Sequence, residues 1–153
     1  MKTLLITPSK LIGQHLKSLK FKNIKIVIIN SGKAEAAMST YAETSEVDYD
    51  LVIYTAFVLG SQQVFEGDLY FPSLTANHDV FLPSESEYDD LRRSIVTEGC
   101  DEIPLLSGES IPSYKRSIIL KEIFTNRRLL FDIEGATIAN IVKDVEIQFY
   151  PIV

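Results

Sequence analysis

Two carboxylates stand where an apolar run passes into a helical pattern, in the stretch "LLFDIEGATIANIV" at residues 129–142. Asp132 lies where the N-cap of the coming helix belongs, and Glu134 lies in its first turn, where the helix dipole favours a negative charge. A second interpretation is chemical, because the two carboxylate oxygens of Glu134 suit the two neighbouring hydroxyls of a ribose. The residue types alone favour capping and leave the ribose-binding interpretation open.

Other candidate sites carry weaker patterns. The turn "NSGK" at residues 30–33 lacks the spaced glycines of a phosphate-binding loop, so an ordinary strand-to-helix turn is the better interpretation. In "NHD", Asp79 could orient the imidazole of His78, although a turn held by Asn77 and Asp79 fits these residues better. With no second histidine or cysteine nearby, we expect no metal site. No dinucleotide, P-loop or hydrolase-elbow motif occurs, so no cofactor is expected.

The elements that would position these residues alternate along the chain. Short apolar runs predict strands at 4–7, 25–30, 50–56, 67–74, 103–107, 128–133 and 147–153. Helices are predicted at 9–19, 33–44, 84–96, 114–125 and 135–143, the first with Ser9 as its cap. The runs "KIVIIN" and "DLVIYTA" are typical of strands buried on both faces, and Pro72 indicates an edge or a bulge.

This alternation predicts an α/β fold with a mostly parallel sheet, in a single domain over residues 1–153. In such sheets, ligands bind beyond the carboxyl ends of the strands. We therefore expect a binding site among four strand exits, at residues 30–33, 56–60, 107–111 and 132–135.

Composition excludes some classes of partner. The chain has 15 basic and 21 acidic residues, for a formal charge of -6, and this balance disfavours a nucleic-acid or anionic-membrane surface. Hydrophobic residues make up 46% and charged residues 24%, as in soluble globular proteins. Cys100 is the only cysteine, so no intrachain disulfide is expected. No signal-peptide core or membrane-spanning run is apparent, which favours the cytoplasm.

Six segments after residue 25 share their order with one family. They read "SGKAEAAMST" (31–40), "DYDLVIYTAFVLGS" (48–61), "VFEGDLYFPSLTANHDVF" (64–81), "LLSGESI" (105–111), "LFDIEGATIANI" (130–141) and "QFYPIV" (148–153). Together they resemble the purine nucleoside phosphorylase/uridine phosphorylase superfamily, in particular its methylthioadenosine/S-adenosylhomocysteine nucleosidase branch. The counterparts there read G-x-G-K-x-x-A-A, P-D-x-V-I-N-T-G-S-A-G-G, K-V-G-D-x-V-V-S…Y-H-D-x-D, S-G-D-x-F-I, x-V-E-M-E-x-x-A-I-A and P-F-x-x-x-R.

The resemblance implies a three-layer αβα fold of the phosphorylase/hydrolase-like type and gives Glu134 a role. The glutamate of the family's M-E pair binds the ribose hydroxyls, so by the matching motif Glu134 takes that role. Ile133 takes the place of the methionine under the sugar. A nucleoside or nucleobase is the implied ligand, and a homodimer or higher homo-oligomer is the implied assembly. The further residues implied to line the pocket are Ala56, Phe57, His78, Asp79, Ser107, Gly108, Ile111 and Asp132.

The family's two catalytic acids have no counterparts. Its N-terminal glutamate would fall in the turn "TPSKLIG" at residues 7–13, which has no acid. Its second acid, which protonates the purine, and its C-terminal helix would follow Val153, so the fold is expected to lack that helix. The T-G-S-A-G-G turn reads "TAFVLG", with bulky side chains where backbone approaches the ligand. Ile111 replaces the aromatic that stacks on the purine, and Pro112 has no backbone N–H for the base.

Loss of both acids decides the predicted function, because general acid–base catalysis contributes about 10² to 10⁴-fold per group. We expect a divergent nucleosidase-like pseudoenzyme that does not cleave glycosidic bonds but still binds a nucleoside or another small ligand. Two alternatives stay open. One is an active nucleosidase or phosphorylase on a modified purine nucleoside, with Asp79, Glu109 or Asp132 as relocated acids. The other is an α/β interaction module without a ligand. At least a dimer is expected, because the apolar terminus "FYPIV" would otherwise be partly exposed.

Overall fold

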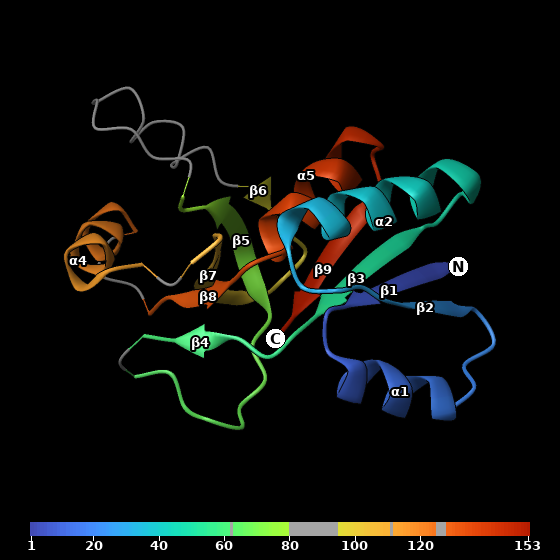
Figure 1. Cartoon of the computed structure of the whole chain (residues 1–153), viewed down its shortest axis with the longest axis horizontal. Coiled ribbons are helices and arrows are strands. Elements are labelled where there is room, and N and C mark those ends of the chain that lie inside the picture. The colour runs from blue at the N-terminus through green and yellow to red at the C-terminus, as the bar shows by residue number, and fades with distance from the viewer. Residues whose placement is uncertain (62, 80–94, 111, 125–127) are drawn as a thin grey trace.

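The computed structural model describes residues 1–61, 63–79, 95–110, 112–124 and 128–153, whose elements alternate much as the sequence predicts (Figure 1). Residues 84–94 of one predicted helix lie outside the described part of the chain. Its last two residues form a short strand instead. None of the described helices is long and apolar enough to cross a membrane.

The first sheet consists of four parallel strands in the order β2-β1-β3-β9. These strands are β1 (Thr3–Thr7), β2 (Ile24–Ile28), β3 (Leu51–Thr55) and β9 (Gln148–Ile152). Every residue of the interior strand β1 is buried, and β3 alternates buried with half-buried side chains. β2 lies at the edge and its side chains are half-buried or exposed, so the prediction that this run is buried on both faces was wrong.

The second sheet is mixed and has the order β4-β8-β7-β5-β6. The central strands β5 (Pro72–Asn77), β7 (Asp101–Ser107) and β8 (Leu130–Asp132) are parallel. At the two edges, β4 (Leu59–Gly60) and β6 (Ile95–Val96) pair antiparallel with their neighbours. The mixed, mostly parallel character is confirmed, but the strands divide between two sheets.

Strand β5 differs from the strand predicted at residues 67–74. It begins at Pro72 and continues to Asn77, between β7 and β6. Proline has no N–H to donate, so it is tolerated as the first residue of a strand. The register against β7 shifts between Pro72 and Leu74. Of the two alternatives predicted for Pro72, the edge strand is therefore wrong, and the irregular register fits the bulge, at the start of an interior strand.

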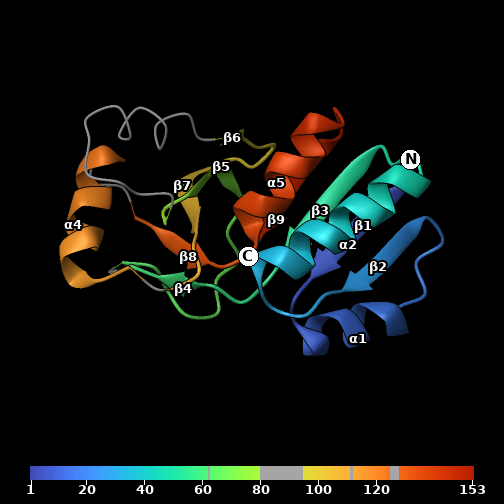
Figure 2. The same ribbon diagram turned by 45° about the horizontal axis from the view of Figure 1, so that its top comes forward.

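Helices lie on both faces of the first sheet, which gives the predicted three layers. Helices α2 (Lys33–Glu46) and α5 (Gly135–Asp144) cover one face, and α1 (Lys10–Ser18) covers the other (Figures 1 and 2). Helix α4 (Tyr114–Ile123) flanks the second sheet, at the opposite end of the molecule from α1. The predicted cap of α1 is confirmed, because Ser9 Oγ accepts a backbone N–H of the first turn at 3.2 Å.

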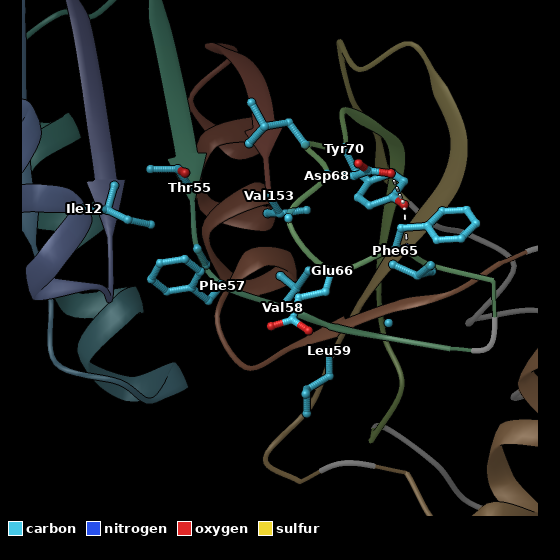
Figure 3. Close-up of a pocket in the computed structure, with 15 residues that line it drawn as sticks. Ile12, Thr55, Phe57, Val58, Leu59, Phe65, Glu66, Asp68, Tyr70 and Val153 are labelled. Carbon is cyan, nitrogen blue, oxygen red and sulfur yellow. Dashed lines mark hydrogen bonds between the residues drawn. The ribbon is translucent and has the colours of Figure 1, made fainter.

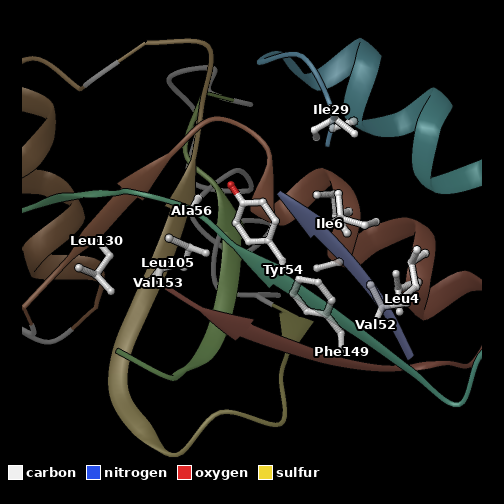
Figure 4. Packing of buried hydrophobic residues seen from close by; sticks show 14 of the residues in the cluster. Leu4, Ile6, Ile29, Val52, Tyr54, Ala56, Leu105, Leu130, Phe149 and Val153 are labelled. Carbon is white, nitrogen blue, oxygen red and sulfur yellow. The ribbon is translucent and has the colours of Figure 1, made fainter. Parts of the chain in front are cut away.

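One hydrophobic core connects the two sheets (Figure 4). Tyr54 of β3 is completely buried, as are Leu105 of β7 and Leu130 of β8 from the other sheet. Interiors pack at the density of organic crystals, so the strand ends of both sheets are held in a fixed relation. The other fully buried members of this core are Leu4, Ile6, Ala36, Val52, Ile138, Ala139 and Val142.

The last apolar residues are covered by the chain itself. Phe149 and Val153 are buried, and Val153 exchanges two backbone hydrogen bonds with Tyr70, at 2.6 and 2.9 Å. Within "FYPIV", Phe149, Pro151 and Val153 are buried, whereas Tyr150 and Ile152 are half-buried, so the expected partial exposure holds for these last two residues only. Exposure of this stretch is therefore a weaker argument for an oligomer than the sequence indicates.

Candidate functional site

Strand exits from both sheets meet at one pocket of about 350 Å³, a size typical of small-molecule sites. We call it the Glu134 pocket. Pro8 follows β1, Ser31 follows β2, Gly108 follows β7 and Glu134 follows β8. The complete lining is Pro8, Ser31, Phe57, Leu59, Gly108, Glu109, Ser110, Phe131, Asp132, Ile133 and Glu134.

The carboxylate of Glu134 is buried and held by three donors. Its side chain is 3% exposed. Oε1 accepts the hydroxyl of Ser31 at 2.7 Å and the backbone N–H of Gly32 at 2.8 Å. Oε2 accepts the hydroxyl of Tyr54 at 3.2 Å. Because Gly32 is the N-cap residue of α2, the carboxylate also lies at the positive end of that helix.

The capping role expected for this stretch belongs to Asp132. Its Oδ2 accepts the backbone N–H of Gly135 at 2.7 Å, and its Oδ1 accepts the hydroxyl of Ser107 at 2.5 Å. Ser107 Oγ in turn accepts the N–H of Ala136 at 2.7 Å. The backbone places Glu134, and not Asp132, at the N-cap position of α5, which corrects the prediction. The side chain of Glu134 nevertheless makes no hydrogen bond to its own helix. Glu134 is thus turned away from α5.

The environment raises the pKa values of two ionisable groups, Asp132 in the pocket wall and Tyr54 behind it. Burial raises the pKa of Asp132 to about 6, assisted by the nearby charge of Glu134, although the hydrogen bonds donated by Ser107 and Gly135 lower it. Burial also raises the pKa of Tyr54 well above its usual range, and the negative charges of Asp132 and Glu134 add to this effect. The phenol therefore stays protonated and remains a hydrogen-bond donor to Glu134.

An ion pair connects two walls of the pocket. Lys33, at the start of α2, contacts Asp79 Oδ1 at 2.6 Å and Asn77 Oδ1 at 3.1 Å. Asp79 Oδ2 accepts the backbone N–H of Glu109 at 2.8 Å, in the loop after β7. Burial by itself raises the pKa of Asp79, but the hydrogen bonds from Lys33 and Glu109 outweigh it and the net pKa is lowered. Asp79 is therefore an ionised structural partner and a poor proton donor.

His78 supports the pocket from behind. Its ring is 2% exposed and meets the ring of Phe131 edge-on, with centroids 5.9 Å apart. Its backbone N–H donates to the Ser107 carbonyl at 2.9 Å. The imidazole ring of His78 packs directly against Gly108, which leaves no room for a side chain at that position.

Replacing Gly108 with alanine should lower the free energy of unfolding by about 1–3 kcal/mol, the usual cost of overpacking a dense site. The added Cβ would lie 2.3 Å from His78 Nε2, and the buried ring has little room to move. Urea denaturation followed by circular dichroism measures the effect. Ser110→Ala, an exposed change in the same loop, is the control, and equal unfolding midpoints for the two variants would contradict the prediction.

A second pocket, of about 620 Å³, adjoins the first (Figure 3). It is lined mainly by apolar residues of the 55–60 and 64–70 segments. Phe57 and Leu59 line both pockets and are 74% and 53% exposed. The bulky turn "TAFVLG" therefore lies on the rim and does not fill the Glu134 pocket. Although the second pocket is larger, neither Asp132 nor Glu134 lines it, so the candidate site is the Glu134 pocket.

The residues predicted for the site are distributed over three positions. Ala56 lines the second pocket. His78, Asp79 and Ser107 lie behind the wall of the Glu134 pocket, where they support its lining. Ile111 lies outside the described residues. Those that line the Glu134 pocket itself are Phe57, Gly108, Asp132, Ile133 and Glu134.

Sequence reasoning missed the donors that hold Glu134. Ser31 and Gly32 belong to the "NSGK" turn, for which the sequence favours an ordinary strand-to-helix turn over a phosphate site, and Tyr54 reads as one apolar residue of a strand. The Gly32 N–H that a phosphate would use is bonded to the Glu134 carboxylate, which would repel an anion. Within the described ranges, no group of three or more His, Cys, Asp or Glu side chains is arranged to hold a metal ion.

Comparison with known proteins gives similarity in structure only. No family model matches the sequence, and no curated protein sequence matches it. A methylthioadenosine/S-adenosylhomocysteine nucleosidase from Colwellia psychrerythraea 34H in complex with adenine superposes with a TM-score of 0.82 at 16% identity, over 99% of this chain and 80% of that one. The S. pneumoniae enzyme with the transition-state inhibitor MT-ImmA gives a TM-score of 0.81 at 16% identity, over 99% of this chain and 84% of that one.

A plant structure agrees with the bacterial ones. The Arabidopsis thaliana 5'-methylthioadenosine nucleosidase in apo form gives a TM-score of 0.78 at 17% identity, over 99% of this chain and 79% of that one. The resemblance noted in the sequence is thereby confirmed at the level of the fold. The chain has the three-layer fold of the methylthioadenosine/S-adenosylhomocysteine nucleosidases, in a strongly diverged form.

Proposed function

We propose that the protein binds a nucleoside in the Glu134 pocket, with the sugar against Ile133 and Glu134, and that it does not cleave the glycosidic bond. The observation that carries the proposal is the carboxylate of Glu134, which is 3% exposed yet lines the pocket. Burying a carboxylate is costly unless it is hydrogen-bonded, and here three donors fix it in advance. A fixed acceptor at a pocket wall is suited to a sugar hydroxyl.

The remaining lining suits a purine. Phe57 and Phe131 supply aromatic surface, and Leu59 adds an aliphatic one. Apolar walls with a few placed polar groups are typical of sites for small molecules. The adenine bound to the Colwellia psychrerythraea neighbour supports the same class of ligand for this fold.

The absence of cleavage is inferred from the state of the candidate acids. The exit of β1 contributes Pro8 to the pocket, in the turn where the family resemblance would place a glutamate and this sequence has no acid. Asp79 is held in its ion pair with Lys33, and both oxygens of Asp132 accept hydrogen bonds from the protein. Each missing acid–base group costs about 10² to 10⁴-fold in rate. Binding without turnover is therefore the function that this site supports.

Calorimetric titration with adenosine, inosine and adenine, combined with chromatography of the incubated nucleosides, tests both halves of the proposal. We expect at least one nucleoside to bind and to be recovered intact. Glu134→Gln should weaken that binding by about tenfold, because a neutral amide gives up a charge-assisted hydrogen bond. Glu109→Gln, which changes an exposed carboxylate of the same pocket, is the matched control. Absence of binding by all three compounds would refute the proposal.

A slow glycosidase is the second candidate, and one observation favours it. Asp132 lines the pocket, and its pKa of about 6 would let it donate a proton near neutral pH. The same chromatographic assay separates the two functions. Release of free base that falls as the pH rises above 6 and disappears in Asp132→Asn would support the glycosidase and contradict binding without cleavage.

A further inference from the structure

We propose that the Glu134 pocket selects a sugar that presents a single hydroxyl to Glu134, as in a 2'- or 3'-deoxynucleoside, over a ribose with its vicinal diol. This inference rests on the proposed nucleoside binding and specifies the substrate class of that site. It follows from counting the donors that already occupy the carboxylate. A carboxylate has about four lone-pair positions, two on each oxygen.

Both positions on Oε1 are occupied. The hydroxyl of Ser31 and the backbone N–H of Gly32 donate to this oxygen at 2.7 and 2.8 Å. A vicinal diol is held by a carboxylate through one hydroxyl on each oxygen. Since Oε1 has no place left, the two-point contact can form only if a protein donor is displaced.

One position remains on Oε2. Tyr54 donates to it at 3.2 Å from inside the core, where its side chain is completely buried. Its phenol stays protonated because burial and the neighbouring carboxylates raise its pKa. Glu134 can thus accept one further donor. A second sugar hydroxyl beside Glu134 would lose its water without finding a further acceptor position on this carboxylate.

The three donors differ in how easily they can be removed. Gly32 donates from the backbone, and Tyr54 is packed among core residues (Figure 4), so neither can turn away. Ser31 is exposed at the pocket wall. Ser31→Ala therefore frees one position on Oε1 without disturbing the core, and it converts the acceptor from a one-hydroxyl to a two-hydroxyl site.

The test is calorimetric titration of the wild type and of two serine variants with adenosine, 2'-deoxyadenosine, 3'-deoxyadenosine and adenine. In the wild type, the better deoxynucleoside should bind about tenfold more tightly than adenosine, since a buried unpaired hydroxyl is disfavoured by roughly that factor. In Ser31→Ala this ratio should fall to within about threefold of unity, by a gain in adenosine affinity. Ser18→Ala, which removes an exposed hydroxyl of α1 outside the pocket, should leave the ratio unchanged.

Tyr54→Phe is a second variant, because it frees a position on Oε2 but leaves Oε1 filled by Ser31 and Gly32, so it should keep the wild-type preference for the deoxynucleoside. Equal or tighter binding of adenosine by the wild type, or an unchanged ratio in Ser31→Ala, would overturn the inference while nucleoside binding itself stands. Equal affinities for adenine and all three nucleosides would overturn it too, because the sugar then does not reach Glu134. If none of the four compounds binds, the proposed function fails and the inference with it.

Discussion

Replacing Glu134 with alanine is expected to lower the free energy of unfolding by about 2–4 kcal/mol, because the buried hydroxyl of Tyr54 loses its acceptor and the truncated side chain leaves a cavity. Three donors lose their acceptor at once, and the hydroxyl of Tyr54 is completely buried. Each unsatisfied buried donor costs about 1–3 kcal/mol, and the vacated volume adds a further cost. The consequence is a protein whose two sheets are less firmly connected, because the donors come from β3 and the start of α2.

Glu134→Gln is the matched control for that prediction. The amide oxygen can accept from Ser31 and Gly32, and the amide nitrogen can donate to the hydroxyl oxygen of Tyr54. We expect this variant to stay within about 1 kcal/mol of the wild type, since all three hydrogen bonds can form. Urea denaturation followed by circular dichroism measures both variants. If Glu134→Ala and Glu134→Gln lowered the free energy of unfolding by the same amount, the hydrogen bonds to Glu134 would not stabilise the fold.

The second large effect is a pH dependence of stability that originates at Asp132. In the unfolded chain this carboxyl has its ordinary pKa of about 3.9, and in the fold burial raises the pKa to about 6. Between these values the folded state binds more protons than the unfolded state, so stability falls as the pH rises. The contribution is fully present below about pH 4 and is lost as the pH rises through about 6. It amounts to at most about 3 kcal/mol, because a tenfold change in a proton equilibrium is about 1.4 kcal/mol.

Asp132→Asn isolates this contribution. The asparagine side chain can still accept the Gly135 N–H but cannot ionise. The free energy of unfolding of the variant should therefore lack the part of the decline between pH 4 and pH 7 that comes from Asp132. Other carboxylates contribute to both proteins alike, and the difference between the two urea-denaturation profiles is therefore the quantity to measure. We expect the free energy of unfolding of the variant to rise steadily relative to that of the wild type from pH 4 to pH 7. Parallel profiles would mean that Asp132 is not desolvated in the fold.

Local patterns predicted most of the elements. The runs that became β1 and β3 are apolar and rich in β-branched residues, and β7 and β9 contain shorter apolar runs. Ser9 marked the start of α1 by a capping hydrogen bond that forms within one turn. These features depend on residues close together in the sequence. Periodicity and capping describe such features well.

Features that depend on distant segments were predicted less well. β2 has the composition of a buried strand but lies at a sheet edge, which depends on the order of strands. Pro72 predicts either an edge strand or a bulge, and only the pairing of β5 with β7 on one side and β6 on the other excludes the edge. The division into two sheets likewise follows from which strands pair. A single sequence contains no direct signal for such pairings.

The candidate site shows the same limit. The sequence identified Asp132 and Glu134 as a pair with two interpretations, capping and hydroxyl binding. The structure gives the capping to Asp132 and directs Glu134 to partners from the β2 exit and from β3. Neither Ser31 nor Tyr54 carries a recognisable motif for this role. Only the meeting of their strands with β8 makes them donors to one carboxylate.

The central claim is that Glu134 holds the sugar of an intact nucleoside, and a crystal structure of the protein soaked with 2'-deoxyadenosine tests it most directly. The account predicts an uncleaved nucleoside in the Glu134 pocket, with one sugar hydroxyl within hydrogen-bond distance of Glu134 Oε2. Free adenine alone, or a pocket without ligand at saturating concentration, would contradict it.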